Sequence, residues 1–420
     1  MKQIAPKNIK DQAVVIPGSK SISHRMMICT SLSNGTSNIK NLLQSDDIKL
    51  TIKGLKNMGA DIDLVKGNHY RISGFGGNPK PCSKAIYLGN SGTSMRLLTG
   101  IAALGTTSYT LTGDKRMCER PMKELLDALT LLGIQAKSKN KKGSPPVYIQ
   151  GGNRAGGLVK IDCSKSSQYL SSLLMIGALM KNGLDIRLDS PPVSSPYIDL
   201  TIDIMKKFKI EVHQIDSMHY QVPGQQSYLQ GDFFVEPDLS NAGYFWAIGA
   251  ITGKMIFVEN INDNSLQGDL KQIRILGQMG CTLKIENNHI GVCGGSLKAV
   301  DVDMSDTPDA VPAIAVVASF AKGKTRIYNI KHLREKECDR IDAVSSQLMK
   351  MGISVKQGED FLEITGGNPK GTRIETFNDH RIAMAFSMPG LIIPGMEIEN
   401  ETCVEKSFPN YWDIFDKLQE

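Results

Sequence analysis

A pattern of about seventy residues recurs five times along this chain, and it restricts the possible folds more than any other feature. Each copy holds a helix end, an alternating segment, a polar turn and a second segment closed by glycines, as in "GLKNMGADIDLVKGNHYRISGFGG" (54–77). Aligned on the helix end, the copies fall at Gly59, Gly133, Lys209, Gly280 and Gly352, spaced 71 to 76 residues apart. Glycine there is typical of a left-handed helix end, and the alternation predicts a half-buried hairpin. A fixed period predicts one supersecondary unit used repeatedly.

A second helix recurs at the same period, and small polar residues precede each copy. The six copies begin near Ser19, Ser91, Ser166, Leu239, Thr307 and Asn378. Such residues cap helix starts, so capping alone explains any single copy as well as ligand binding does. The sequence thus contains six of these helices but only five complete hairpins, so one hairpin is missing.

The two chain ends offer the missing strands. The last helix, in "PNYWDIFDKLQE", runs out of chain before a hairpin, while "QIAPKNIKDQAVVIPG" at the start resembles paired strands with no helix before them. Joining the ends completes a sixth unit. We therefore predict two domains, 18–226 and 1–17 plus 227–420, joined by two crossings, and a length of 420 residues suits two domains.

Composition excludes several classes of protein. No apolar run approaches the roughly 18–20 residues of a membrane span, and the start lacks the parts of a secretory signal, so we expect a cytoplasmic protein. The eight cysteines are scattered and no histidines have ligand spacing, which supports neither a disulfide framework nor a metal site. A net charge of +6 without a basic stripe interleaved with aromatics argues against nucleic acid.

Cationic residues stand beside the helix starts, where the helix dipole disfavours them. They are Lys20, Arg25, Arg96, Arg120, Lys336, Arg340, Arg381 and Lys406. An anionic ligand would remove this conflict. The stretch "PGSKSISHR" is not a nucleotide-binding P-loop, because Ser19 stands directly before Lys20 where that motif requires glycine.

The ordered motifs resemble one family. "PGSKSISHR", "LGNSGTSMR", "ERP", "SSQYL", "TPDA", "REKECDR", "NDHRIAM" and "CVEKSFPNYW" are similar to the motifs of 5-enolpyruvylshikimate-3-phosphate synthases, over essentially the whole chain. The resemblance implies an α/β enolpyruvyl transferase fold, a two-domain inside-out barrel of six βαβαββ units, three per domain. It implies transfer of the enolpyruvyl group of phosphoenolpyruvate to the 5-hydroxyl of shikimate 3-phosphate, with release of phosphate.

The resemblance also assigns site residues. It implies that shikimate 3-phosphate contacts Lys20, Ser21, Arg25, Ser166, Ser167, Gln168, Ser194, Tyr197, Asp309, His332 and Lys336. It implies that phosphoenolpyruvate contacts Lys20, Gly92, Arg120, Gln168, Arg340, Arg381 and Lys406. The implied catalytic groups are Asp309, which accepts the hydroxyl proton, Glu337, which handles the methylene proton, and Lys20, which assists. No metal, nucleotide or organic cofactor is implied, and we expect a monomer that binds only small molecules.

Some residues have structural explanations too, and some depart from the family pattern. Glu337 fits a solvated charge in a first helical turn, His380 a structural histidine, and Asp47 a helix cap. The departures are Glu335, where the family has a small or apolar residue, His332, where some members have asparagine, and Leu97, where some have proline. Gly92 occurs where bulk excludes glyphosate in tolerant relatives, so we expect sensitivity to that inhibitor.

Two alternative functions stay open. The sister transferase acting on UDP-N-acetylglucosamine carries a cysteine five residues before its Arg-Pro pair, whereas Lys115 stands five before Arg120 here and Cys118 only two before. A non-catalytic anion-binding protein of the same fold would have no use for the complete set of implied catalytic and clamp residues.

Overall fold

The computed structural model describes residues 1–6 and 8–418, and this part of the chain forms six small mixed sheets in two compact units. The N-terminal unit comprises Gly18–Val235, and the C-terminal unit comprises Met1–Pro17 with Glu236–Glu420. The sequence predicted the second crossing near residue 226. Asn41 Nδ2 donates to the carbonyl of Val235, and the backbone amide of Val235 donates to that of Lys40, which keeps the chain in the N-terminal unit for nine residues more.

In the N-terminal unit, the sheets have the orders β14-β3-β5-β4, β6-β7-β9-β8 and β10-β11-β13-β12. The strands are β3 (Thr36–Lys40), β4 (Asp61–Lys66), β5 (His69–Ser73), β6 (Ile86–Tyr87), β7 (Ser108–Thr112), β8 (Gln135–Ser138), β9 (Val147–Gln150), β10 (Gly157–Ile161), β11 (Leu184–Leu188), β12 (His213–Asp216), β13 (His219–Val222) and β14 (Asp232–Phe234). The helices are α1 (Lys20–Leu32), α2 (Asp46–Asn57), α3 (Gly92–Ala103), α4 (Lys123–Leu131), α5 (Gln168–Gly177) and α6 (Pro196–Lys207), with a 3₁₀ turn η1 (Met117–Glu119).

In the C-terminal unit, the sheets have the orders β16-β17-β15-β2, β18-β19-β21-β20 and β1-β23-β22. The strands are β1 (Lys2–Ile4), β2 (Gln12–Val14), β15 (Ile256–Val258), β16 (Thr282–Glu286), β17 (His289–Cys293), β18 (Asp301–Asp303), β19 (Lys324–Tyr328), β20 (Ser354–Gln357), β21 (Leu362–Thr365), β22 (Arg373–Ile374) and β23 (Met396–Ile398). The helices are α7 (Leu239–Thr252), α8 (Lys271–Gln278), α9 (Val311–Ala318), α10 (Arg340–Lys350), α11 (His380–Ser387) and α12 (Tyr411–Lys417). Five 3₁₀ turns connect them: η2 (Gly268–Leu270), η3 (Pro308–Ala310), η4 (Lys331–Glu335), η5 (Met388–Leu391) and η6 (Glu401–Lys406).

The repeat in the sequence becomes a repeat in the sheets. Each four-stranded sheet has one parallel pair followed by an antiparallel hairpin, and the five predicted hairpins are β4-β5, β8-β9, β12-β13, β16-β17 and β20-β21. The helix-end residue that precedes each hairpin by two to four positions has a positive φ: Gly59, Gly133, Gly280 and Gly352 do, and so does Lys209 at +63°. The prediction of a left-handed helix end is therefore confirmed in all five copies, including the one without glycine.

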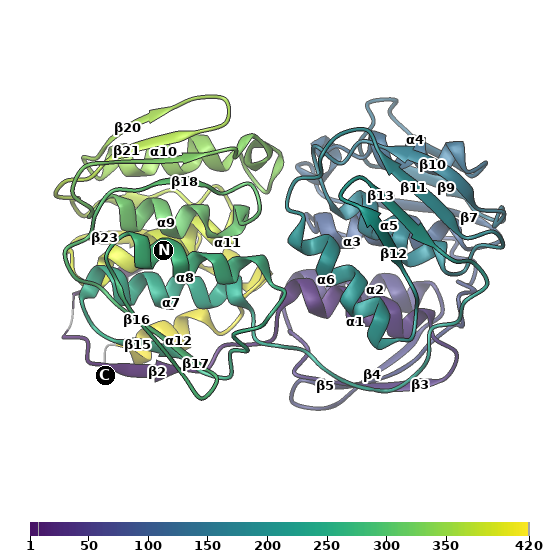
Figure 1. The fold of residues 1–420 in the computed structure, drawn as a ribbon, viewed down its shortest axis with the longest axis horizontal. Coiled ribbons are helices and arrows are strands. Elements are labelled where there is room, and N and C mark those ends of the chain that lie inside the picture. The colour runs from purple at the N-terminus through teal and green to yellow at the C-terminus, as the bar shows by residue number, and fades with distance from the viewer. Residues whose placement is uncertain (7, 419–420) are drawn as a thin grey trace. The chain divides into compact units, whose positions relative to one another are not determined.

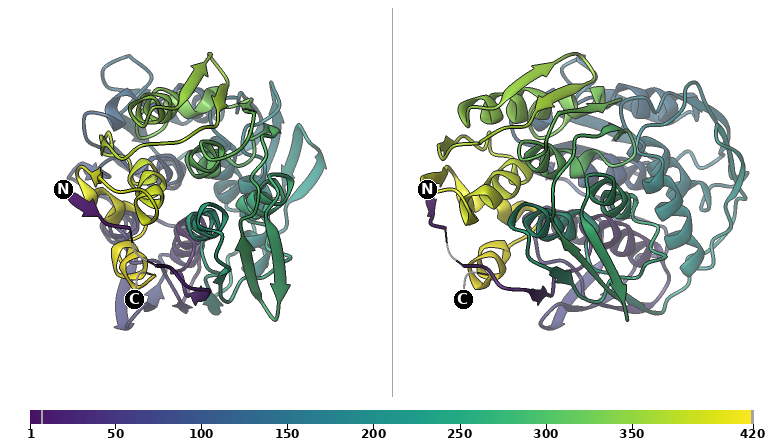
Figure 2. Two further views of the ribbon diagram at one scale, coloured as in Figure 1. Left: turned by 90° about the vertical axis from the view of Figure 1, so that its left-hand side faces the viewer. Right: turned by 60° about the vertical axis from the view of Figure 1, so that its left-hand side comes forward.

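The N-terminal strands do not pair with each other, so that part of the prediction is wrong. Strand β1 runs antiparallel to β23, whereas β2 runs parallel to β15 in a different sheet. Figure 1 shows β2, in purple, within the C-terminal unit, and Figure 2 shows the purple N-terminal segment beside yellow C-terminal segments. The last sheet therefore receives a single strand from the chain start. In the N-terminal unit, β14 comes from the end of the unit and pairs parallel to β3 near its start.

The first helix of each repeat is buried on nearly every side. These helices are α1, α3 and α5 in one unit and α7, α9 and α11 in the other. The second helices bury one face, as is typical at a protein surface. Each unit has its own apolar core around its inner helices. Polar residues at the starts of the inner helices are therefore buried, and they need partners or ligands.

Candidate active site

Arg25 lies inside the N-terminal unit, 1 % exposed, and among the described residues its hydrogen bonds go to neutral groups. Its Nε donates to Thr201 Oγ1 at 2.7 Å and its Nη2 to Ser171 Oγ at 3.2 Å. The remaining bonds go to the carbonyl oxygens of Ser21, at 3.1 Å, and Tyr197, at 3.3 Å. Burial lowers the pKa of Arg25 to about 10, which leaves the guanidinium charged at neutral pH. A buried cation held by neutral groups is well suited to an anionic ligand.

Three serines of the predicted phosphate site are buried in the same unit. Ser166 and Ser167 precede α5, and Ser166 Oγ accepts a bond from the amide of Gln168 at 3.3 Å. Ser194 lies just before α6 with φ +55°, a conformation that non-glycine residues rarely adopt. Among the described residues, its buried hydroxyl has no hydrogen-bond partner. Strain together with an unsatisfied buried donor is typical of a ligand-binding position.

Gly92 and Arg120 are in direct contact. A Cβ atom on Gly92 would stand 2.6 Å from Arg120 Nη2 and 2.8 Å from its Cζ. Arg120 is buried, and its Nη1 donates to the carbonyl and to the side-chain oxygen of Asn90, each at 3.1 Å. Only a glycine leaves room for this guanidinium against the start of α3.

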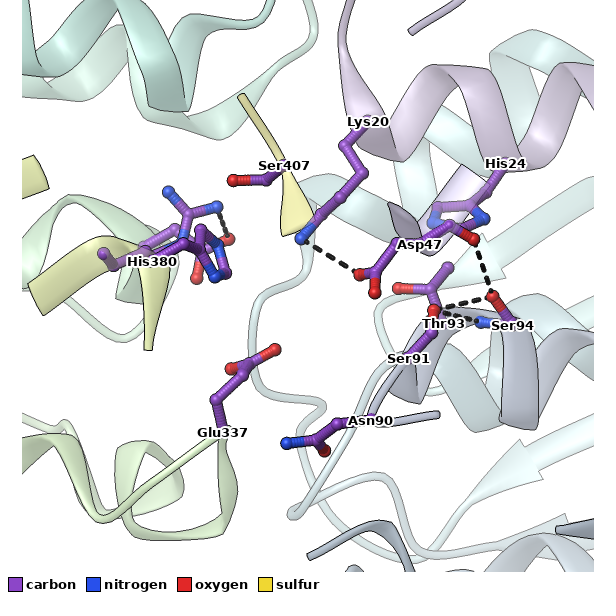
Figure 3. Close-up of polar contacts among 12 residues, drawn as sticks. Lys20, His24, Asp47, Asn90, Ser91, Thr93, Ser94, Glu337, His380 and Ser407 are labelled. Carbon is purple, nitrogen blue, oxygen red and sulfur yellow. Dashed lines mark hydrogen bonds and ion pairs between the residues drawn. The ribbon is translucent and has the colours of Figure 1, made fainter. Parts of the chain in front are cut away.

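Lys20 opens α1 and faces the start of α2. Its Nζ lies 3.6 Å from Asp47 Oδ2, and both side chains are largely buried (Figure 3). Asp47 is therefore more than a helix cap, because its carboxylate faces a predicted catalytic lysine.

Gln168 is held by the start of α3. Arg96 Nη1 donates to Gln168 Oε1 at 2.9 Å, and Gln168 Nε2 donates to Thr93 Oγ1 at 3.0 Å. The Arg96 guanidinium also lies over the Tyr169 ring, 5.4 Å from its centroid. Arg96 thus fixes the amide of Gln168, a residue that the sequence assigned to both substrates.

In the C-terminal unit, Arg340 joins three carboxylates. Its Nη1 donates to Asp309 at 2.8 Å, its Nη2 to Glu337 at 2.7 Å and its Nε to Asp379 at 2.8 Å. Arg340 is 1 % exposed, and burial works against its charge. The nearby carboxylates, Asp379 first, outweigh burial and raise its pKa well above the ordinary value.

Arg381 binds the other oxygen of Asp309. Its Nη2 lies 2.6 Å from Asp309 Oδ2, and its Nη1 lies 3.3 Å from the hydroxyl of Tyr244. Burial again opposes the charge, but Asp309, Tyr244 and Asp269 together outweigh it and raise the pKa of Arg381. Both oxygens of Asp309 are thus fixed by arginines, while a fifth of its side chain, 21 %, stays exposed.

The other residues singled out in this unit lie in η4, α11 and η6. His332 is buried in η4, and burial, followed by the charge of Lys336, lowers its pKa to about 3. Its Nε2 has no hydrogen-bond partner among the described residues. His380 is completely buried, with Nδ1 3.6 Å from Asp379. Lys406 ends η6 and is half-buried.

The departures from the family pattern differ in their surroundings. Glu335 is exposed on η4, whereas Leu97 is buried within α3.

Several supporting residues were missed in the sequence. Asp379 holds Arg340 and also caps α11, where its carboxylate accepts from the amide of Arg381 at 2.9 Å. The sequence offered a signal for Asp379, since it lies two residues before Arg381 in "NDHRIAM". It offered none for Thr201 or Ser171, which are hydroxyls inside helices.

The described part of the chain contains neither a metal cluster nor a disulfide. Among the described residues, no group of three or more His, Cys, Asp or Glu side chains could hold a metal ion, and all eight cysteines are free thiols. No helix in this part of the chain is both long and apolar enough to cross a membrane.

Known proteins resemble this chain over its whole length. The family model of EPSP synthase (3-phosphoshikimate 1-carboxyvinyltransferase) matches residues 5–415. A 3-phosphoshikimate 1-carboxyvinyltransferase of Marinomonas sp. (strain MWYL1) is 39 % identical over 418 residues, covering 99 % of this chain and 98 % of the relative. That of Methanocaldococcus jannaschii is 42 % identical over 409 residues, covering 96 % and 95 %.

A solved structure agrees with these relatives. EPSP synthase from Acinetobacter baumannii, at 2.37 Å, superposes with a TM-score of 0.84 at 30 % identity, covering 99 % of this chain and 97 % of that one. The predicted fold class is thereby confirmed. From this evidence, the chain belongs to the EPSP synthase family and is a 3-phosphoshikimate 1-carboxyvinyltransferase of the shikimate pathway.

Proposed function

We propose that each unit contributes a distinct part of this reaction. In the proposal, the N-terminal unit supplies most of the contacts to shikimate 3-phosphate, and the C-terminal unit supplies the two catalytic carboxylates. The carrying observation is that Asp309 and Glu337, the two implied catalytic carboxylates, share the guanidinium of Arg340.

Shikimate 3-phosphate carries a carboxylate and a phosphate, and the proposed ligands suit both. Arg25 supplies buried positive charge without a competing carboxylate. The phosphate is bound by Ser166, Ser167 and Ser194 in this proposal, and Ser194 has the unsatisfied hydroxyl described above. The other proposed contacts are Lys20, Ser21, Gln168, Tyr197, Asp309, His332 and Lys336. His332 is neutral at physiological pH, which supports a hydrogen-bonding role in place of the asparagine of other members.

Phosphoenolpyruvate needs cations for its phosphate and carboxylate. The proposed set is Lys20, Gly92, Arg120, Gln168, Arg340, Arg381 and Lys406. Arginine suits both groups because its fork donates two parallel hydrogen bonds. Gly92 enters the set because it makes room for Arg120.

The proton transfers fall to two carboxylates. In the proposed mechanism, the oxygen of the 5-hydroxyl attacks C2 of phosphoenolpyruvate, and Asp309 accepts the proton of that hydroxyl. A proton is added to the C3 methylene in the same step, which gives a tetrahedral intermediate. Glu337 delivers the proton to C3 and later takes a proton from C3. Loss of that proton restores the double bond as the C2–O bond to phosphate breaks. Lys20 assists, and the cations stabilise the charge that develops on the leaving phosphate.

The arginine contacts give the carboxylates a defined position before substrate arrives. Asp309 is held on both oxygens, so its orientation costs little additional entropy during the reaction. Arg340 also carries Asp379, a third carboxylate, which supports a role in positioning as well as in binding.

The remaining proposals concern the state of the protein. We propose that it acts as a cytoplasmic monomer on small molecules alone, without nucleic acid or membrane.

The test is phosphate release by the purified protein. Phosphoenolpyruvate is supplied with shikimate 3-phosphate and, in parallel, with UDP-N-acetylglucosamine. We expect release only with shikimate 3-phosphate, and loss of turnover in Asp309→Ala and Glu337→Gln that exceeds their loss of substrate binding. Unchanged turnover in either variant would remove that residue from its proposed role, and release only with the sugar nucleotide would contradict the substrate assignment.

A further inference from the structure

A chain of buried side chains links three helices of the N-terminal unit. His24 Nδ1 lies 2.8 Å from Thr51 Oγ1, which lies 2.7 Å from Ser94 Oγ, which lies 2.6 Å from Ser91 Oγ. Each of the four residues is 0 % exposed. His24 belongs to α1, Thr51 to α2 and Ser94 to α3, and Ser91 caps α3. Figure 3 shows His24, Ser94 and Ser91. We call these four side chains the hydroxyl chain.

The hydroxyl chain also reaches the backbone beside Lys20. Thr51 Oγ1 and Ser94 Oγ both approach the carbonyl oxygen of Asp47, at 3.3 and 3.4 Å. The carboxylate of the same Asp47 faces Lys20 Nζ at 3.6 Å. The other end of the chain, Ser91, stands directly before Gly92. The network therefore extends from the partner of Lys20 to the start of α3.

These contacts are not the ordinary way in which a buried helical hydroxyl is satisfied. In the same helices, Ser31 Oγ donates to the carbonyl of Met27 at 2.8 Å, and Thr99 Oγ1 donates to that of Met95 at 2.7 Å. Such bonds stay within one helix. Thr51 and Ser94 also contact each other across two helices, which ties the register of α2 to that of α3.

The chemistry of hydroxyl groups makes the chain act as one device. Each hydroxyl has one hydrogen to donate and can accept up to two bonds, so the donor chosen for one bond restricts the donors available to its neighbours. In a buried setting such bonds strengthen one another, and interrupting one leaves its neighbours unsatisfied. Methyl groups would fill this space without that risk. The hydroxyl chain is therefore better explained by exact placement of the three helix starts than by a gain in stability.

We propose that the hydroxyl chain is a positioning device that fixes Lys20 and Gly92 relative to each other and thereby sets the affinity for phosphoenolpyruvate. This inference rests on the proposed roles of Lys20, Gly92 and Arg120. Its members are positioning residues. The shikimate 3-phosphate contact Arg25 is held separately, by Ser171 of α5 and Thr201 of α6.

The experiment compares matched variants in steady-state kinetics. Thr51→Val removes the central hydroxyl at nearly constant shape, Ser94→Ala removes the next one, and Thr51→Ser restores the hydroxyl. Ser31→Ala is the matched control, because the hydrogen bond that its buried hydroxyl donates, to the carbonyl of Met27, stays within α1. We expect Thr51→Val and Ser94→Ala to raise KM for phosphoenolpyruvate about tenfold, as sub-ångström misplacement of a clamp does. KM for shikimate 3-phosphate should rise less, because Lys20 is only one of its proposed contacts and Arg25 is held separately. Thr51→Ser and Ser31→Ala should stay near the parent protein.

The outcomes distinguish a failure of this inference from a failure of the proposed phosphoenolpyruvate clamp on which it rests. Arg120→Lys is measured in parallel as a test of the clamp itself. If Arg120→Lys raises KM for phosphoenolpyruvate and both chain variants only lower Tm, the hydroxyl chain is merely structural and the inference is wrong. If the chain variants raise KM while Arg120→Lys does not, the chain is supported and the Arg120 assignment is overturned. Unchanged KM in all three variants overturns both. Should Thr51→Val fail to fold, Ser94→Ala alone decides.

Discussion

Replacing Gly92 with alanine offers a sharp test of the proposed phosphoenolpyruvate clamp. The added Cβ would stand 2.6 Å from Arg120 Nη2, whereas ordinary contact begins at 3.4 Å, so the guanidinium must retreat by about 0.8 Å. The backbone at Gly92 is not in the left-handed region, and alanine favours a helix more than glycine does. We therefore expect unchanged or slightly higher thermal stability together with weaker substrate binding.

The size of the binding loss follows from the contact that is disturbed. A hydrogen bond to a charged group is worth about 1.5–3 kcal/mol, and one such contact between Arg120 and phosphoenolpyruvate would be lost or lengthened. We expect KM for phosphoenolpyruvate to rise about 10- to 150-fold, with KM for shikimate 3-phosphate nearly unchanged.

A double-mutant cycle identifies the cause. Gly92→Ala is made in the parent protein and in Arg120→Ala, and phosphate release is measured at varied phosphoenolpyruvate. If the alanine acts by displacing Arg120, it should add little to the KM of the Arg120→Ala protein. An equal rise in both backgrounds would refute the steric reasoning.

The remaining predictions concern charge, pH and inhibition. Arg340→Lys should lower the free energy of unfolding by about 3–5 kcal/mol and reduce turnover, because one ammonium cannot bind all three carboxylates. Urea unfolding measures the stability and phosphate release measures the turnover. A variant that stays stable and active would contradict this prediction. Burial, then the charge of Asp309, raises the pKa of Asp269 to about 7, so the folded protein binds a proton that the unfolded chain releases, and stability should fall as pH rises from about 4 to about 7. Asp269→Asn should remove this loss, on the order of 4 kcal/mol, in unfolding curves across that range; parallel curves would count against it. His332 has the opposite sign: its pKa of about 3 means that stability is lost as pH falls from about 6.5 toward 3, and His332→Asn should flatten acid unfolding in that window. Glyphosate should inhibit phosphate release by the parent protein, and undiminished activity at high inhibitor would overturn that expectation.

What could be read from the sequence was the local and repeated part of the structure. The helix ends, the five hairpins and the buried helix starts follow from glycine placement, alternation and capping residues, each of which acts within a few residues. The position of Lys209 shows the strength of the repeat, because it keeps the left-handed conformation at φ +63° without a glycine. The cations at helix starts indicated an anion-binding protein because they conflict with a local electrostatic rule.

Long-range pairing was decided only in three dimensions. The sequence could not separate β1 from β2, since the choice between pairing with each other and pairing with β23 and β15 depends on strands hundreds of residues away. The partners of Arg25 were equally hidden: Thr201 and Ser171 are ordinary helical hydroxyls until α5 and α6 bring them to the guanidinium. The same holds for Asp379 beneath Arg340 and for the contact between Thr51 and Ser94. Hydrogen bonds act over about 3 Å in space without regard to sequence separation, so only the packed fold selects which polar groups meet.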